Sequence, residues 1–172
     1  MIPIPRSFQR LAAEIDGWLD LRCPEKALER LAPMLESPQG RQGALYLRVR
    51  ALVALGRYEE ALEDIAALRS SPIDPDWLDL TEAWCRKRVG DLPAAIGCMR
   101  SLLERNQRSA IGHFNLGCYL ALSGMLDEAL DEVTLACGID EEFRSLANSE
   151  RDLDALAGDP RFQSLLRKKP LA

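Results

Sequence analysis

The sequence predicts an all-α protein, an α-solenoid of four helical hairpins followed by capping helices. The first observation is an alanine that recurs at a fixed interval of 34 residues, at Ala27, Ala61, Ala95 and Ala129. The second is a turn residue five positions before each alanine, at Arg22, Gly56, Gly90 and Gly124. The third is that apolar side chains on both sides of these turns are spaced by three and four residues, as on one face of a helix. A fixed interval of this length is typical of repeat architectures.

The second hairpin shows the pattern of each unit. One apolar stripe precedes Gly56, at Leu45, Val49, Leu52 and Leu55, and another follows it, at Tyr58, Leu62, Ile65 and Leu68. Gly56 suits the reversal between the two helices, because glycine adopts positive φ without steric cost. Pro72 and Pro75 end the second helix. Each unit is therefore predicted to be a helix, a turn and a second helix.

The fourth hairpin resembles the tetratricopeptide repeat family, whose pattern is W-x-x-L-G-x-x-Y followed by A-x-x-x-F. Its matching residues are His113 at the Trp position, Leu116, Gly117, Leu120 at the Tyr position, Ala129 and Val133. The second hairpin has a typical turn of the family over residues 56–62. The resemblance implies a right-handed α-solenoid, with small residues such as Gly117 and Ala83 where paired helices cross.

The resemblance covers residues 8–143 and divides them into units 8–41, 42–75, 76–109 and 110–143. Glu14, Arg48 and Glu82 depart from the pattern at the position of Leu116, and Arg22 replaces the first turn glycine. Residues 1–7 are expected to be a loose arm. Residues 144–172 are expected to form capping helices, because the last hairpin would otherwise expose an apolar face.

The composition limits the function. The 172 residues include 22 Lys and Arg against 27 Asp and Glu, a net charge of −5, which disfavours nucleic-acid binding and with it a pentatricopeptide reading. Charges interrupt every apolar stretch, so no membrane span is expected, and the start of the chain does not look like a signal peptide. A cytoplasmic, bacterial-type protein is the expectation. A helical bundle without repeats is disfavoured, because it would not keep the constant spacing of 34 residues between the four alanines.

No catalytic, metal or cofactor site is predicted. The five cysteines are too far apart for a zinc ribbon and are expected to be small buried hydrophobic residues. His113 is the single histidine and is expected to face the interior of its hairpin. The carboxylates Glu59, Glu60, Glu63 and Asp64 are expected on an exposed helix face.

The first helices of such repeats line a concave surface, and the resemblance implies which positions face it. The candidate partner-binding groove is lined by Tyr46, Leu47, Arg50, Trp77, Leu80, Thr81, Trp84, Phe114, Asn115 and Cys118, with Ala12 and Asp16 from the first unit. Trp77 and Trp84 are assigned either to this groove or to the core. Trp18 is assigned to the core. Aromatic residues and Arg dominate binding energy at interfaces.

The groove positions Ala12, Asp16, Leu47, Trp77 and Thr81 cannot form the positive clamp of repeat proteins that grip chaperone tails. Charge is uneven: residues 76–109 carry six basic and five acidic residues, and residues 110–143 carry seven acidic residues and no Lys or Arg. Two interpretations of this charge difference remain open. The charged residues lie on solvated helix faces without further role, or they steer a partner that itself carries separate positive and negative regions.

The predicted function is a non-enzymatic module that binds a partner peptide or helix in its concave groove, with Arg50 and Asn115 orienting the partner backbone. The alternatives are a dedicated chaperone resembling those of type III secretion and a self-assembling structural subunit. The expected state is a monomer or weak homodimer.

Overall fold

The computed structural model describes residues 4–167, and every regular element in this range is a helix. The chain divides into two compact units, the first ending at Val89 and the second beginning at Gly90. Each unit has its own packed interior, so each is described by itself.

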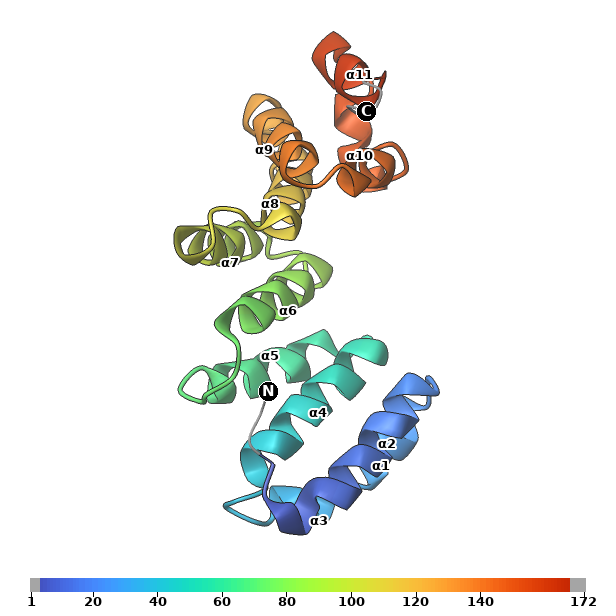
Figure 1. Cartoon of the computed structure of the whole chain (residues 1–172), viewed down its shortest axis with the longest axis vertical. Coiled ribbons are helices and arrows are strands. Elements are labelled where there is room, and N and C mark those ends of the chain that lie inside the picture. Colours follow the sequence, from blue (N-terminus) through green and yellow to red (C-terminus); the bar gives the residue numbers. More distant parts are fainter. Residues whose placement is uncertain (1–3, 168–172) are drawn as a thin grey trace. The chain divides into compact units, whose positions relative to one another are not determined.

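The first unit is built of paired helices (Figure 1). α1 packs on α2, α4 packs on α5, and α6 packs on α5. Apolar residues from these helices form buried clusters, with Ile15, Val49 and Ile65 inaccessible to solvent. The elements are η1 (Arg6–Phe8), α1 (Gln9–Asp20), α2 (Pro24–Glu29), α3 (Ala32–Leu35), α4 (Arg41–Ala54), α5 (Tyr58–Leu68) and α6 (Pro75–Arg88).

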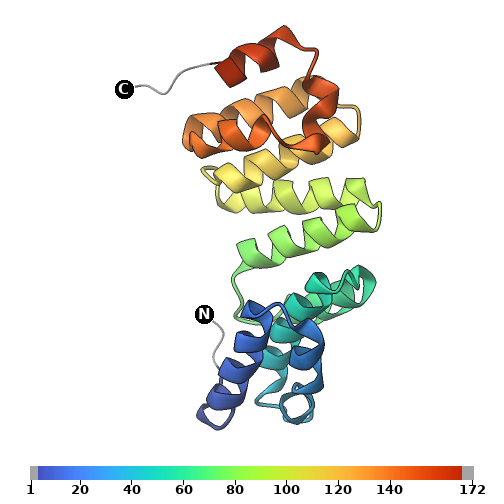
Figure 2. The ribbon, with the colours of Figure 1, turned by 90° about the vertical axis from the view of Figure 1, so that its right-hand side faces the viewer.

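The second unit is centred on a hairpin of α8 and α9, which lie side by side (Figure 2). α7 packs on α8 from one side. The elements are α7 (Leu92–Arg105), α8 (Ala110–Leu122), α9 (Leu126–Ile139), α10 (Glu142–Ala147), η2 (Arg151–Leu156) and α11 (Pro160–Arg167).

The four predicted turn residues have positive φ, which confirms the turn positions. The φ angles are 56° at Arg22, 72° at Gly56, 85° at Gly90 and 80° at Gly124. After α4 the amide of Arg57 donates to the carbonyl of Leu52 at 2.9 Å, the hydrogen bond that closes a helix end when the preceding residue is left-handed. Arg22 therefore adopts a conformation that costs a residue with a Cβ atom more than it costs glycine.

The second helix of the first hairpin differs from the simple expectation, because it is broken into α2 and α3. Pro33 is the second residue of α3. Proline has no amide hydrogen and disfavours helical geometry in the residue before it, so one continuous helix is interrupted here.

Two of the three residues that depart from the family pattern are explained by ion pairs across a hairpin. Glu14 on α1 accepts a hydrogen bond of 2.9 Å from Arg30, and Arg48 on α4 donates one of 2.6 Å to Asp64 on α5. In both pairs the partner is 16 residues further along the chain. Asp64 is only 4% exposed, so its expected place on an exposed face was wrong. An opposite charge across the hairpin satisfies this buried carboxylate.

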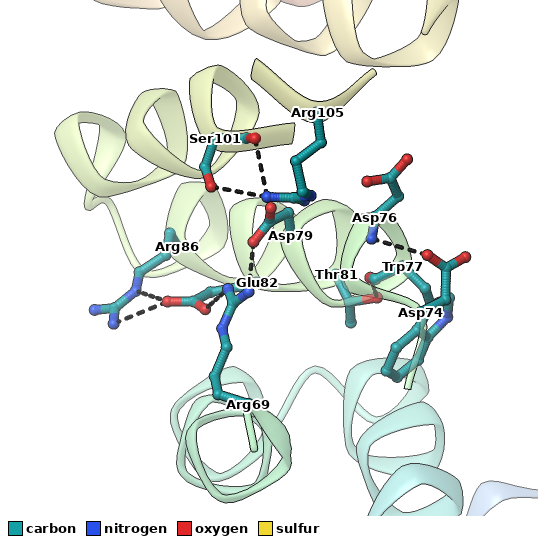
Figure 3. Close-up of polar contacts among 10 residues, drawn as sticks. All are labelled: Arg69, Asp74, Asp76, Trp77, Asp79, Thr81, Glu82, Arg86, Ser101 and Arg105. Atoms are coloured by element: carbon teal, nitrogen blue, oxygen red, sulfur yellow. Dashed lines mark hydrogen bonds and ion pairs between the residues drawn. The ribbon is translucent and has the colours of Figure 1, made fainter. Parts of the chain in front are cut away.

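The third departing residue, Glu82, belongs to a network on the side of α6 that faces α5 (Figure 3). Arg69 contacts both Glu82 and Asp79, donating to the Asp79 carboxylate at 2.5 Å. Glu82 also accepts from Arg86 at 3.3 Å. Asp79 is 2% exposed, so Arg69 ties α5 to a buried charge on α6.

The crossing of α8 and α9 confirms the predicted role of Gly117. A Cβ atom at this position would lie 2.6 Å from the Cγ2 atom of Val133. His113 is buried, as predicted, and its two ring nitrogens lie 2.5 Å from a Glu132 carboxylate oxygen and 3.0 Å from the Gln107 carbonyl oxygen. His113 therefore links α8 to α9 through polar contacts and not by apolar packing alone.

The ends of the chain pack on their own units. η2 contacts α8 and α9, and α10 and α11 contact α9. Leu153 and Leu156 of η2 are each 1% exposed, which is consistent with a capping segment. The Asp159 carboxylate accepts from the Arg161 amide at 2.7 Å at the beginning of α11. Ile4, expected in a loose arm, is half-buried against the core of the first unit.

Candidate functional site

The first unit contains a pocket with a volume of about 480 Å³. It opens between the first helices of successive hairpins, α1 and α4, and the start of α6. The lining residues are Ile4, Gln9, Ala12, Ala13, Asp16, Tyr46, Leu47, Arg50, Ile73, Asp74 and Trp77.

Six of these residues are positions that the sequence places on the concave surface. Helix α1 contributes Ala12 and Asp16, α4 contributes Tyr46, Leu47 and Arg50, and α6 contributes Trp77. The side chains come together because equivalent positions of helices in adjacent repeats face the same way.

Five lining residues were missed by sequence reasoning, which placed none of them on the groove, and one of these is Ala13 beside Ala12 on α1. Ile73 and Asp74 come from the connection between α5 and α6, where the Asp74 carboxylate accepts from the Asp76 amide at 3.0 Å and starts α6. The pair Asp74 and Pro75 is a helix-start signal that could have placed this rim. Gln9 and Ile4 lie at the beginning of the described chain, where no periodic pattern marks their position.

An aromatic pair forms one wall of the pocket. The rings of Tyr46 and Trp77 lie 4.5 Å apart between centroids, tilted by 45°, and both side chains are partly buried. Trp77 thus packs against the apolar cluster and lines the pocket as well. Ala12 and Ala13 of α1 also line the pocket, and their small side chains leave space between the helices.

The polar part of the pocket is an ion pair. Arg50 contacts the carboxylate of Asp16, lies 3.9 Å from that of Asp20, and stacks over the Tyr46 ring at 5.8 Å. The Asp16 side chain remains 50% exposed and that of Arg50 31% exposed. Arg50 is therefore held in place by acidic neighbours from α1.

The predicted residues further along α6 lie outside the pocket lining. Leu80 and Thr81 are half-buried, and the Thr81 hydroxyl donates to the Trp77 carbonyl at 2.7 Å (Figure 3). Trp84 is 43% exposed. Trp84 is therefore not a core residue. Trp77 packs against the apolar cluster and also lines the pocket.

Two predicted groove residues of the second unit are buried, which corrects their assignment to an open surface. Phe114 is 5% exposed and Cys118 is 3% exposed. The ring of Phe143 lies 5.1 Å from that of Phe114 and covers it. Asn115 beside them is half-buried. The physical reason is that the chain after α9 returns over α8.

The pocket lining offers apolar and aromatic side chains, one guanidinium, two carboxylates and one amide. Within residues 4–167, His, Cys, Asp and Glu side chains form no group of three or more suited to holding a metal ion. No helix in the same range is long and apolar enough to cross a membrane.

Comparisons with known proteins identify the class. The sequence model described as Tetratricopeptide repeat matches residues 80–142. This match confirms the resemblance predicted from the sequence for residues 80–142, which belong to the tetratricopeptide repeat family.

Solved structures extend the similarity to nearly the whole chain. The crystal structure of YrrB, described as a TPR protein with an unusual peptide-binding site, has a TM-score of 0.69 at 18% identity, covering 90% of this chain and 80% of YrrB. MamA from Desulfovibrio magneticus RS-1, from residue 41 to the end, has a TM-score of 0.73 at 15% identity, covering 95% of this chain and 96% of that one. The MamA RS-1 ArsTM double mutant has the same TM-score and identity, covering 96% and 97%. No curated protein sequence matches the chain. The predicted all-α fold of helical hairpins is therefore confirmed.

Proposed function

We propose that this protein is a non-catalytic interaction module and that the pocket of its first unit binds an apolar side chain from an extended or helical segment of a partner protein. The observation that carries the proposal is the convergence of Ala12, Asp16, Tyr46, Leu47, Arg50 and Trp77 on one pocket. YrrB, which has a similar fold, is described as having a peptide-binding site.

The energetic reasoning concerns preorganisation. Tyr46 and Trp77 contact each other, and Arg50 is fixed by Asp16, so these side chains lose little further freedom when a partner binds. Tyr, Trp and Arg are also the residues most often found to dominate interface energies. Binding of one apolar side chain would bury the exposed parts of the two rings and leave Arg50 to orient the partner backbone.

The same pocket also suits the alternative roles, a dedicated chaperone of a secreted or assembling client and a self-assembling subunit. In either role the occupant differs and the binding residues are the same. We propose a monomer or weak homodimer in the cytoplasm, and light scattering at several concentrations tests the oligomeric state.

The test is capture of partners from native lysate by the wild-type protein and by the double variant Tyr46→Ala with Arg50→Ala. Partners identified by mass spectrometry with the wild type should be lost or strongly depleted with the variant, while circular dichroism remains helical. A control carries two truncations of exposed residues in the second unit, Arg100→Ala and Leu135→Ala. Equal capture by all three proteins would show that partners bind elsewhere.

A further inference from the structure

We infer that the partner segment bound at the pocket of the first unit carries a Lys or Arg next to its apolar anchor, and that this basic side chain binds against the Asp74 carboxylate and the Trp77 ring. The inference rests on the function proposed above and specifies the chemistry of the partner. It is carried by two residues at the start of α6 that both line the pocket.

Asp74 brings a negative charge to the pocket that no basic side chain among residues 4–167 neutralises. Its carboxylate accepts a hydrogen bond of 3.0 Å from the Asp76 amide and so caps α6, but it forms no ion pair in this part of the chain. An ionised carboxylate accepts on both oxygens, so capping the helix leaves acceptor sites for a partner. Asp74 is also exposed to solvent, where a partner reaches it.

The other charges of the lining do not offset Asp74. Arg50 is the basic side chain of the lining, and it already contacts the Asp16 carboxylate and lies 3.9 Å from that of Asp20. The lining therefore has two carboxylates against one guanidinium, a net charge of −1. A partner carboxylate at this wall would be repelled by Asp74, whereas a partner cation would be attracted.

Trp77 adds an aromatic ring that no cation of the described chain covers. The Lys26 ammonium lies 4.5 Å from the centre of the Trp18 ring, and the Lys87 ammonium lies 5.5 Å from that of Trp84. Trp77, the third tryptophan, has no such neighbour among residues 4–167, although tryptophan is the side chain that attracts cations most strongly. The aliphatic stem of a Lys or Arg packs on such a ring and leaves its charged head free to reach a carboxylate.

The geometry of the pocket places the basic residue close to the anchor. Asp74 and Trp77 are three positions apart at the start of α6, a spacing that makes side chains neighbours on a helix (Figure 3). The volume of about 480 Å³ is in the range of sites that hold a small molecule, so an apolar side chain and the stem of a basic one fit together. Because an extended segment advances about 3.3 Å per residue, the basic residue lies within about two positions of the anchor.

The test is selection of a phage-displayed library of random dodecapeptides on the full-length protein. The wild type should enrich peptides with a bulky apolar residue and, within about two positions of it, Lys or Arg. On the variant Asp74→Asn the apolar preference should persist and the basic preference should disappear. Asn caps a helix about as well as Asp, so this variant removes the charge and keeps the start of α6.

The matched control is Asp91→Asn in the second unit. Asp91 caps α7 by accepting from the Ala94 amide at 3.2 Å, and it is not part of the pocket lining. The control therefore makes the same substitution at the same kind of position, with the same change of net charge. It should keep both the apolar and the basic preference.

A double-mutant cycle on a selected peptide then measures the pairing by fluorescence anisotropy. Asp74→Asn should weaken binding about fivefold, and replacing the Lys or Arg of the peptide by Gln should weaken binding to the wild type by a similar factor. The two changes together should cost no more than either alone, because each removes the same ion pair.

The outcomes separate the inference from the proposed function. Enrichment without a basic preference, a basic preference that Asp74→Asn retains, or losses that multiply in the cycle would overturn the inference and leave the proposed pocket standing. No enrichment on the wild type, or selection indifferent to Tyr46→Ala with Arg50→Ala, would overturn the proposed function and the inference with it.

Discussion

At the scale of single residues, Gly117 is the most constrained position of the second unit. A Cβ atom there would lie 2.6 Å from Val133 Cγ2 and 3.0 Å from the carbonyl oxygen of Ala129, and the second contact is with backbone. We expect Gly117→Ala to lower the free energy of unfolding by about 1–3 kcal/mol, because α8 and α9 must move apart to make room. Urea denaturation followed by circular dichroism measures this change.

The matched control is Gly97→Ala in α7, where a Cβ atom would meet nothing within 4 Å. Alanine costs less backbone entropy than glycine in a helix, so this variant should be neutral or more stable by about 0.5–1 kcal/mol. Equal losses at both positions would mean that the helix crossing does not depend on a small residue.

Cys85 provides a prediction about reactivity. Burial, together with the nearby carboxylate of Glu82, raises the pKa of the Cys85 thiol to about 11. At pH 8 we therefore expect iodoacetamide to modify half-buried Cys23 well before Cys85, with sites and rates measured by mass spectrometry. Rapid modification of Cys85 in the folded protein would contradict its burial.

The same shift fixes the sign of a pH effect. Because the pKa of Cys85 is raised above its ordinary value of 9.0, the folded state retains the proton that the unfolded state releases. The contribution of this thiol to stability is complete below pH 9 and is lost as the pH rises toward 11. The variant Cys85→Ala should lack this part of the alkaline destabilisation.

At the scale of elements, the turns were predictable from the sequence and the helix interruption was predictable only in part. The 34-residue interval predicted turns at Gly56, Gly90 and Gly124, and these residues have positive φ. It also predicted a turn at Arg22, which has positive φ although residues other than glycine rarely adopt it. Pro33 was visible in the sequence, but the break between α2 and α3 was not foreseen from the repeat pattern.

The charged residues that replace a family leucine show what a single repeat pattern leaves out. Glu14 and Arg48 each meet an opposite charge 16 residues later, which makes an ion pair where the family has apolar packing. The sequence contains a sign of these pairs, because both partners follow at the same interval of 16 residues. The interval relates the two helices of one hairpin, so a comparison of single positions with the family pattern does not detect it.

The capping segment carries a prediction of its own. Leu153 in η2 is 1% exposed, whereas Leu146 in α10 is 49% exposed. Leu153→Ala should lower the free energy of unfolding by about 2–4 kcal/mol, because it leaves a cavity. Leu146→Ala is the control and should change it by no more than about 0.5 kcal/mol. Thermal denaturation that shows equal effects would contradict a capping role for η2.

At the scale of the whole molecule, the sequence located the candidate site better in the first unit than in the second. Tyr46, Leu47, Arg50 and Trp77 line one pocket because the repeat interval alone sets their direction. Phe114 and Cys118 obey the same interval but are buried, because Phe143 comes from the chain that follows α9. No periodic rule predicts where a non-repeating segment packs.

The most direct test of the central claim, binding at the pocket of the first unit, follows the indole N–H resonances of the three tryptophans by NMR while a peptide from a captured partner is added. The account predicts a saturable shift of the Trp77 resonance and a stationary resonance for Trp18, which packs against Lys26 at 4.5 Å and lies outside the pocket lining. A peptide that saturates the protein and leaves Trp77 unmoved would contradict it.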